Sequence, residues 1–377
     1  MNINDFISGQ WQQQYQYKSF LPELINHPWV INDEKLNYLL STANIRLGEL
    51  NAFSMLVPDI DFFIKMHVNK EATTSSRIEG TQTNIEEALQ KAENINPEKR
   101  NDWQEVHNYV AAMNLSIENL ANLPLSNRLI RQAHEVLLQG VRGEHKQPGD
   151  FRTSQNWIRG SSINDAVFIP PHKDEVPELM SDLEKFLNDH TLYIPDLVKI
   201  AIAHYQFETI HPFLDGNGRI GRLMITLFLV SKGILIKPTL YLSEFFEKNK
   251  VLYYENLMRV RTHNDLQRWL LFFFEGVRQT SENSIETFKK IIRLRSRLEQ
   301  TEITKLGKKT KSAHQFLNYL YSQPIVDSGD VAAALQINSS TAHRMIDDFM
   351  KLNILKELTG NKRNRIFIFN EYVDLFK

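Results

Sequence analysis

Apolar residues recur at helical spacing through most of the first 300 residues. Residues 125–140 show the pattern best: Ser126 can cap the helix, Gly140 can end it, and one face carries Ile130, Ala133 and Leu137. The same spacing predicts helices over 177–187 and 196–209. The first 300 residues are therefore predicted to be mainly helical.

Strand signals are few in this region. The best is the run 166–169, which lies between Asn-Asp and Pro-Pro pairs. Together with residues 156–160 it predicts a short β-hairpin.

A change of pattern follows residue 300. Lysines cluster around Gly307 in residues 301–311, which predicts a linker. Beyond it, the pattern predicts three helices and then two strands around a Thr-Gly-Asn-Lys turn, over 313–321, 328–335, 339–352, 354–358 and 365–369. This order predicts a separate winged helix-turn-helix domain.

Composition restricts the class of protein. The length of 377 residues favours two or three domains, and 42% apolar with 24% charged residues is typical of a globular chain. A net charge of -1 gives no overall attraction to nucleic acid or membrane, and zero cysteines exclude disulfides and thiolate metal sites. The start of the sequence lacks a secretory pattern, and the apolar run 223–236 is too short to span a bilayer. We expect a soluble cytoplasmic protein without a membrane partner.

The segment from His211 to Arg222 reads HPFLDGNGRIGR and lies between two predicted helices. Gly216 and Gly218 allow the backbone to turn tightly and to approach an anion. The following helix presents free N–H groups at its start, which favour negative charge. Arg219 and Arg222 share a face of its first turn, where an anionic ligand would offset their unfavourable interaction with the helix dipole.

Two further side chains of this segment add chemistry. Asp215 offers the hard oxygen ligand that magnesium prefers, and His211 can accept a proton near neutral pH. The spacing alone is equally compatible with an ordinary helix–loop–helix corner. A helix precedes the glycines, which excludes a Rossmann fingerprint, and no Gly-Lys-Ser/Thr follows, which excludes a Walker A loop.

The twelve residues resemble the signature of the Fic family, His-x-Phe-x-Asp/Glu-Gly-Asn-Gly-Arg-x-x-Arg, at every specified position. The resemblance implies AMP transfer from ATP, with His211 as the base and Asp215 as the ligand of Mg2+. It implies that Asn217 and the glycine amides hold the α-phosphate, that the arginines hold the leaving phosphates, and that Phe213 points into the core. The nucleotide-binding residues it implies here are Gly216, Asn217, Gly218, Arg219, Ile220, Gly221 and Arg222.

Two neighbouring regions also resemble the family. The predicted hairpin 156–170 takes the place of a flap that docks the target protein by strand addition, although a plain surface hairpin fits the sequence as well. Downstream, the resemblance implies adenine contacts from Asn249, Tyr254 and Leu257. Aromatic residues at helical spacing are also typical of a core, so that alternative stays open.

A second motif lies upstream, at the end of a helical stretch that begins near Asp59. Ser75 and Glu79 are four residues apart, and Gly80 follows, as at an ordinary helix end. The segment also resembles the inhibitory helix of Fic proteins, Ser/Thr-x-x-x-Glu-Gly/Asn. That resemblance implies that Glu79 pairs with Arg222 and blocks a productive γ-phosphate position.

The region after residue 300 carries eleven basic and eight acidic residues. Ser339, Ser340, Thr341, His343 and Arg344 open the predicted recognition helix, and Lys362, Arg363 and Arg365 lie at the wing. These residues could contact DNA, whereas Asp347 and Asp348 oppose tight phosphate contact. Winged helices also dock proteins, so both partners stay open, and the resemblance makes a homodimer plausible.

The predicted fold is mainly α: a Fic-type helical core with a β-hairpin flap and a C-terminal α+β winged helix. We expect an N-terminal region carrying the inhibitory helix over 1–100, a catalytic core over 101–300 and the winged helix over 301–377. The predicted function is autoinhibited transfer of AMP to a Ser, Thr or Tyr hydroxyl of a target protein or of the chain itself. The alternatives are a DNA-binding regulator that senses nucleotide, or a Fic enzyme that uses another phosphate-containing donor or removes AMP.

Overall fold

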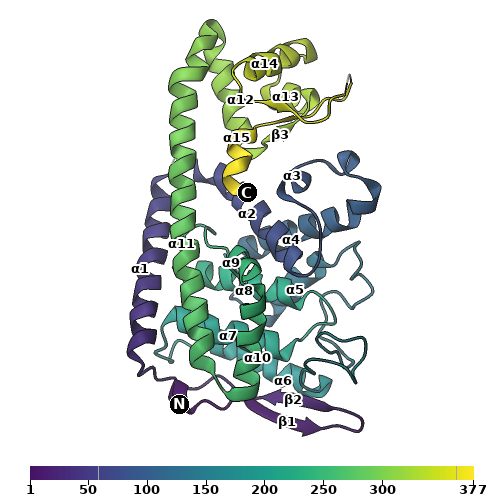
Figure 1. Cartoon of the computed structure of the whole chain (residues 1–377), viewed down its shortest axis with the longest axis vertical. Coiled ribbons are helices and arrows are strands. Elements are labelled where there is room, and N and C mark those ends of the chain that lie inside the picture. Colours follow the sequence, from purple (N-terminus) through teal and green to yellow (C-terminus); the bar gives the residue numbers. More distant parts are fainter. Residues whose placement is uncertain (58, 362) are drawn as a thin grey trace.

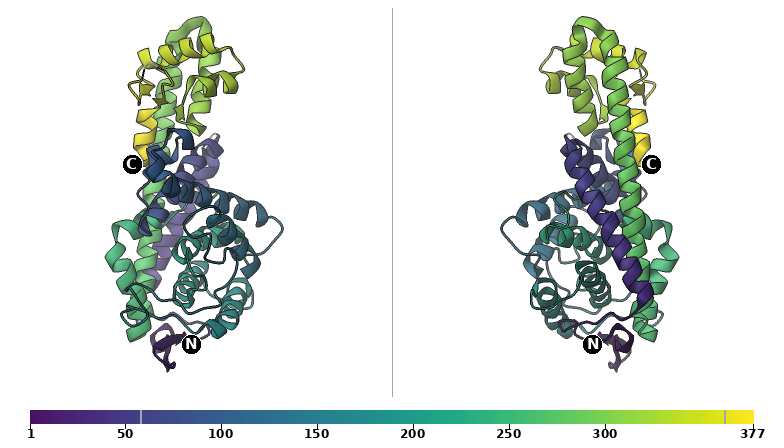
Figure 2. Two further views of the ribbon diagram at one scale, coloured as in Figure 1. Left: turned by 90° about the vertical axis from the view of Figure 1, so that its right-hand side faces the viewer. Right: turned by 90° about the vertical axis from the view of Figure 1, so that its left-hand side faces the viewer.

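The helix α11 (Leu266–Arg297) runs along much of the molecule in the computed structural model, which describes residues 1–57, 59–361 and 363–377 (Figure 1). Helix α1 (Glu34–Leu56) packs along it, as Figure 2 also shows. The buried side chains of α1 recur every three or four residues, which gives it one apolar face against α11. These two helices form one side of the molecule.

Two almost fully buried helices form the centre of the core. Helices α7 (Asp196–Ile210) and α8 (Asn217–Ser231) pack against each other, and nearly all their side chains are buried. Helices that are apolar on all sides are typical of a core. Around them lie α4 (Arg100–Asn119), α5 (Asn127–Leu137) and α6 (Val176–Asn188).

Helix α2 (Ile60–Ile78) lies between this core and the C-terminal part of the chain. It packs against α4, α8, the short helix α9 (Ser243–Lys248) and α12 (Thr310–Ser322). Helix α3 (Ile85–Ala88) follows it, and α10 (Lys250–His263) leads from α9 to α11.

The predicted helices of the core are present, with shifted ends. Ser126 caps α5 by accepting a hydrogen bond from the Leu129 amide. The helix ends at Leu137 rather than at Gly140, which lies beyond it at a φ of +67°. The strands β1 (Gly9–Gln13) and β2 (Lys18–Pro22) form an antiparallel hairpin near the N-terminus that the sequence analysis did not predict.

The predicted β-hairpin over 156–170 is reduced to one bridge, between Ile158 and Phe168. Residues 166–169 therefore do not form a regular strand, but the two predicted segments do pair antiparallel at this bridge. The Asp165 carboxylate accepts hydrogen bonds from the amides and hydroxyls of Ser161 and Ser162. These bonds close a compact turn, which leaves little chain for strand pairing.

The segment 301–311, predicted as a linker, is helical. A π-helical turn (Leu298–Glu302) and a 3-10 segment (Ile303–Lys309) continue α11 and lead into α12. The chain turns at Gly307, whose φ of 57° falls in the region that glycine adopts easily.

The C-terminal part has the order of elements that the sequence predicted. Helices α13 (Ser328–Leu335) and α14 (Ser339–Lys351) precede β4 (Lys356–Glu357) and β5 (Phe367–Ile368). A further strand, β3 (Ile325–Val326), completes a sheet of order β3-β5-β4, and α15 (Asn370–Val373) and a 3-10 turn (Asp374–Phe376) end the chain. Lys362, predicted at the wing, lies outside the described residues.

The C-terminal part contacts α2 and the segment after it. Phe63 and Tyr321 meet edge to face with ring centroids 5.4 Å apart. Two ion pairs add to this contact, from Lys91 to Asp327 at 2.7 Å and from Lys377 to Glu86 at 2.6 Å. Domain boundaries at residues 100 and 300 stay a prediction. Among the helices of the described residues, none has the length and apolar character needed to cross a bilayer.

Candidate active site

The loop between α7 and α8 is held by its own side chains. Helix α7 ends at Ile210, and the next residue, His211, adopts a left-handed conformation with φ 50° and ψ 60°. The Asn217 side chain accepts a hydrogen bond from the Phe213 amide and donates one to the Phe213 carbonyl, both at 2.8 Å. Phe213 is fully buried and stacks on His134, as expected of a residue that points into the core. Asn217, expected to hold the α-phosphate, thus fixes the loop in this structure.

His211 is also fixed through its backbone. Its carbonyl accepts hydrogen bonds from Arg152 Nε at 3.0 Å and from Asn156 Nδ2 at 3.2 Å. Burial first, and then the nearby Arg261 and Arg152 guanidiniums, lower the pKa of the imidazole to about 3. Its Nδ1 atom is buried and has no hydrogen-bond partner within the described parts of the chain. The ring is therefore neutral at physiological pH and can accept a proton.

Arg222 joins α8 to the end of α2. Its Nε donates to Ser75 Oγ and its Nη2 donates to the Ser75 carbonyl, both at 2.9 Å. Its Nη2 also pairs with Glu79 Oε1 at 2.7 Å, so the expected contact between Glu79 and Arg222 is present. Burial opposes ionisation of Glu79, but the guanidinium of Arg222 outweighs it and lowers the pKa of that carboxyl.

The Glu79 carboxylate lies directly over Gly218. A Cβ atom on Gly218 would stand 2.2 Å from Glu79 Oε1 and 2.9 Å from Arg222 Nη1. Gly218 lies in the first turn of α8, where unpaired N–H groups and the helix dipole favour an anion. Glu79 therefore supplies a negative charge at the position expected for a phosphate.

Arg219 has different partners from Arg222. Its Nη1 pairs with Glu105 Oε2 of α4 at 3.2 Å, and its Nη2 lies 3.6 Å from Asp215 Oδ1. The side chain of Asp215 is 44% exposed, and its Oδ1 also accepts a hydrogen bond from the Gly216 amide. In this structure Arg219 thus supports Asp215 and the loop.

A cavity of about 300 Å³ adjoins His211, Gly218 and Arg222. Its other walls come from the end of α2, the predicted flap, α7 and α10. They consist of Glu79, Trp157, Ile158, Arg159, Val167, Phe168, Glu208, Tyr253, Tyr254, Leu257, Met258 and Arg261. Tyr254 and Leu257, expected near adenine, thus face the cavity, and the Arg159 guanidinium lies 4.6 Å over the Tyr254 ring. Asn249, expected beside them, lines a different cavity.

The remaining residues of the motif serve the packing of α8. Ile220 is 2% exposed and belongs to the core. The Gly221 carbonyl accepts a hydrogen bond from His204 Nδ1 at 2.9 Å, and His204 Nε2 in turn accepts one from the Tyr253 hydroxyl. A Cβ atom on Gly221 would stand 2.4 Å from Glu208 Oε1, so glycine leaves room for that carboxyl group.

Glu208 and Arg261 were missed by the sequence analysis. Glu208 is 7% exposed, and burial raises its pKa to about 7. Arg261 is buried, donates to the Glu208 carbonyl at 2.9 Å, and lies 4.0 Å over the Phe168 ring. The spacing of Glu208, three residues before His211 on a helix, was an available signal. No sequence signal pointed to Arg261, because its position beside the cavity depends on how α10 packs.

Comparison with known families matches two segments of the chain. Residues 37–118 match the Fic/DOC family N-terminal region, and residues 124–229 match the Fic/DOC family. The second segment contains the loop, His211 and both arginines, and the first contains Ser75 and Glu79.

Known proteins also resemble part of the chain. Protein adenylyltransferase fic-1 of Caenorhabditis briggsae is 29% identical over 152 residues, 37% of this chain and 28% of the relative. Protein adenylyltransferase Fic of Drosophila melanogaster is 25% identical over 180 residues, 46% of this chain and 33% of the relative. The match thus spans about a third of these curated relatives.

The fold as a whole also has a relative of known structure. The crystal structure of a Fic family protein from Desulfovibrio desulfuricans G20 superposes with a TM-score of 0.58 at 20% identity, covering 91% of this chain and 98% of that chain. This likeness shows that the mainly helical Fic fold, which the sequence predicted, is correct.

Proposed function

The chain belongs to the Fic/DOC family, and on that premise we propose that it is a protein adenylyltransferase, which transfers AMP from ATP to a protein hydroxyl. The names of its relatives support this activity. The observation that carries the proposal is that one cavity brings the His211 base beside the start of α8 and Arg222. A base beside an anion site is what a transfer to phosphorus requires.

In the proposed reaction, His211 removes the proton of the target hydroxyl as its oxygen attacks the α-phosphorus of ATP. A bond forms between that oxygen and phosphorus, the bond from phosphorus to the bridging oxygen breaks, and pyrophosphate leaves. The neutral imidazole is ready to accept the proton, and the negative charge of ATP would raise its pKa from about 3. The amides at the start of α8 would stabilise the charge that builds on the α-phosphate.

Asp215 is the residue proposed to hold Mg2+. The described residues contain no group of three or more His, Cys, Asp or Glu side chains arranged to hold a metal ion. A single exposed carboxylate still fits, because magnesium is commonly held by one or two carboxylates together with substrate phosphates. Bound there, the ion would neutralise charge on the phosphate oxygens. Arg219 and Gly216 orient the carboxylate through Oδ1.

We propose that Glu79 acts as a brake on this reaction. Its carboxylate lies over Gly218 and takes one of the donors of Arg222. A phosphate oxygen at the same place would meet a like charge and would find that donor already engaged. Ser75 supports the contact by holding the other side of the guanidinium.

The flap over 156–170 is the proposed docking site for the target protein. Trp157 is 40% exposed and Val167 is 52% exposed, and both line the cavity beside His211. The bridge between Ile158 and Phe168 leaves a short backbone edge that an extended segment could join. Contact with adenine is proposed for Tyr254 and Leu257. DNA contact through the C-terminal part, and a homodimer, stay predictions.

Intact-protein mass spectrometry after incubation with ATP and magnesium tests the proposal. We expect the mass of one or more AMP groups on Glu79→Gly and no such gain on Glu79→Gly/His211→Ala. A different added mass would indicate another donor. Retained binding of ATP and DNA with no transfer in any form would favour the nucleotide-sensing regulator.

A further inference from the structure

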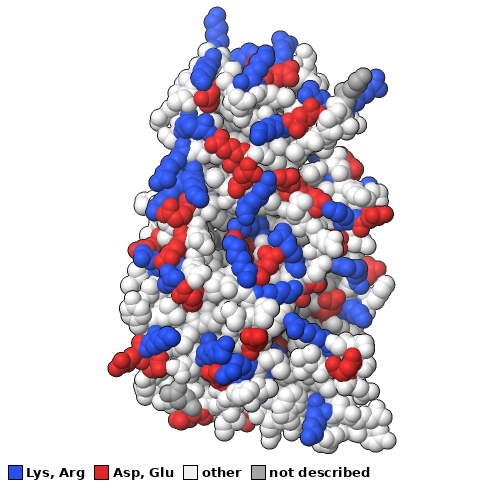
Figure 3. Space-filling model, viewed as in Figure 1, with Lys and Arg blue, Asp and Glu red and all other residues white. Residues whose placement is uncertain are grey.

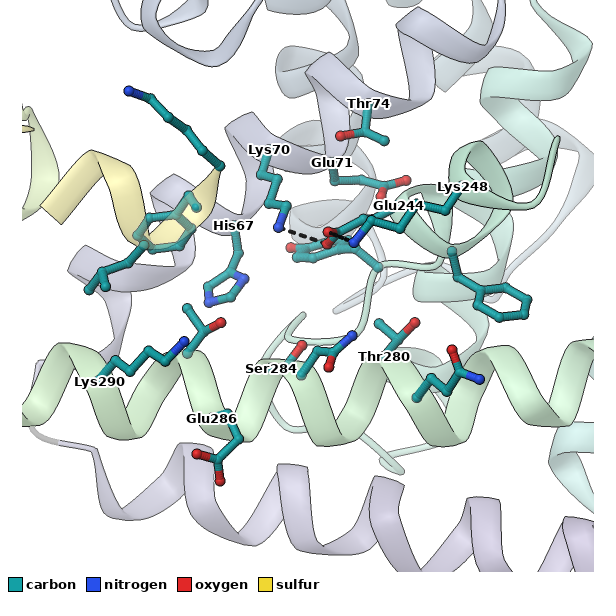
Figure 4. Close-up of a pocket in the computed structure, with 18 of the residues that line it drawn as sticks. His67, Lys70, Glu71, Thr74, Glu244, Lys248, Thr280, Ser284, Glu286 and Lys290 are labelled. Carbon is teal, nitrogen blue, oxygen red and sulfur yellow. Dashed lines mark hydrogen bonds and ion pairs between the residues drawn. The ribbon is translucent and has the colours of Figure 1, made fainter. Parts of the chain in front are cut away.

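A second cavity, of about 370 Å³, lies between α2, α9 and α11 and reaches the last residues of the chain (Figure 4). None of the residues that line it also lines the cavity beside His211. Its volume falls in the range of small-molecule sites, about 300–1,000 Å³. It is therefore large enough for a ligand of its own.

Two buried polar groups in this cavity lack partners. His67 Nε2 and the Tyr241 hydroxyl are buried and have no hydrogen-bond partner within the part of the chain that the structure describes, and each residue is 7% exposed. His67 points from α2 into the cavity, and its ring is held between Phe288 and Phe376 at centroid distances of 4.8 and 5.0 Å. Burial lowers the pKa of His67 to about 3, so its ring is neutral. Unpaired buried polar groups cost stability, which a ligand could recover.

Four lysines and three glutamates line the cavity; the fourth lysine, Lys377, pairs with Glu86 and Asp374. Lys70 and Lys248 share one partner, Glu244, at 2.7 and 2.6 Å. Lys290 has no ion pair with any residue in the described ranges and reaches along α11 toward His67 (Figure 4). Figure 3 shows Lys and Arg side chains, with Asp and Glu side chains among them, over the middle of the face seen in Figure 1.

The two other carboxylates near the cavity are engaged elsewhere. Glu286 also lines the cavity, but its carboxylate points away from His67 in Figure 4 and pairs with Lys289 at 2.6 Å. Glu71 accepts hydrogen bonds from the Ser243 hydroxyl and the Tyr109 hydroxyl, and burial raises its pKa. A ligand in the cavity would therefore meet mainly ammonium, hydroxyl and amide groups.

We propose that this cavity binds a small phosphate monoester. Lys70, Lys248 and Lys290 would hold the phosphate, because ammonium groups bind phosphate oxygens through charge-assisted hydrogen bonds. The organic part would meet the neutral polar groups of α11, which Figure 4 shows on the cavity side at Thr280 and Ser284. The His67 ring and the Tyr241 hydroxyl would complete the set of donors.

Such a ligand would act on the proposed brake, and this step rests on the proposed function. It would connect α2, through Lys70 and Thr74, with α9 and α11. Thr74 directly precedes Ser75, which holds Arg222. A ligand that binds best when α2, α9 and α11 are placed as in this structure favours that placement over other conformations. Occupancy of the cavity therefore stabilises the contact between Glu79 and Arg222 and lowers AMP transfer.

Calorimetric titration of the full chain with ribose 5-phosphate tests the site. We expect Lys290→Ala to weaken binding about tenfold, since it removes a charge-assisted contact, and Lys289→Ala to change it by less than about twofold. Both lysines are on α11, but only Lys290 lines the cavity, whereas Lys289 pairs with Glu286. No binding, or equal binding by both variants, overturns the site. Inorganic phosphate binding as tightly as ribose 5-phosphate overturns the monoester assignment.

A second measurement separates the site from its effect on the brake. Ribose 5-phosphate should lower AMP transfer by the wild type and by Lys289→Ala, but not by Lys290→Ala. Glu79→Gly should bind the sugar phosphate normally and transfer AMP at a rate that does not respond to it. Equal inhibition of Glu79→Gly overturns the link to the brake. If no form transfers AMP, the proposed function fails, while the titration still decides the site.

Discussion

Replacing Glu79 with glycine should raise AMP transfer, because Glu79 covers the start of α8. The substitution removes the carboxylate that lies over Gly218 and frees one donor of Arg222. Arg222 keeps its two hydrogen bonds to Ser75, so the guanidinium should stay in place. The variant therefore removes the carboxylate that occupies the anion site but leaves the start of α8 and Arg222 in place.

The expected size of the rise in AMP transfer follows from the one contact that the substitution removes. Hydrogen bonds to charged groups contribute about 1.5–3 kcal/mol, and the 2.7 Å contact from Arg222 Nη2 to Glu79 Oε1 is of this kind. The Glu79 side chain is 34% exposed, so solvent screening places the value near the lower end, about 1.5–2 kcal/mol. Since about 1.4 kcal/mol corresponds to a factor of ten, transfer should rise roughly ten- to thirtyfold.

The assay is the rate of AMP gain by mass spectrometry at saturating ATP and magnesium. Glu79→Ala should give the same rise as Glu79→Gly, which excludes an effect of glycine on the helix end. Arg77→Ala is the matched control, because Arg77 lies in the same turn and makes an exposed ion pair with Glu247. If Arg77→Ala activates as much as Glu79→Gly, the rise reflects loosening of α2, and the brake mechanism is refuted.

Three other predictions concern the same site. Ser75→Ala should raise transfer by less than Glu79→Gly, since it removes the hydrogen bond from Arg222 Nε to Ser75 Oγ but leaves Glu79 over Gly218; a larger rise would contradict the assignment of the brake to Glu79. Asp215→Ala in the Glu79→Gly background should lower transfer and raise the magnesium concentration needed for half-maximal rate, as a magnesium titration would show. The pKa of Glu208, about 7 in the folded protein, exceeds its ordinary value, so folding stability should fall as pH rises through 7. Melting temperatures at pH 6 and pH 8 should therefore differ more in the wild type than in Glu208→Gln.

The sequence was informative where function depends on neighbouring residues. The loop from His211 to Arg222 forms a unit because α7 and α8 present its ends together, so its motif could be read directly. The pairing of Glu79 with Arg222 joins residues 143 positions apart, and only the family resemblance predicted it. Helices with one apolar face, such as α5, were also predictable from spacing.

Other features depend on packing that no local pattern encodes. The β1–β2 hairpin was missed, although its strands pair through five residues each. Asn249 and Tyr254 lie five residues apart, but α10 begins between them, so only Tyr254 faces the cavity beside His211. Burial raises the pKa of Glu208, and burial by distant segments is invisible in the sequence.

The packing of α1 along α11 has a consequence for synthesis and folding of the chain. More than 200 residues separate these helices, so the apolar face of α1 has no final partner until most of the chain has been made. Contacts between such distant segments slow folding and leave apolar surface exposed to aggregation in the meantime. A nascent chain that stalls before residue 266 would display the row of Leu36, Leu40, Leu47 and Leu50 to solvent and to chaperones.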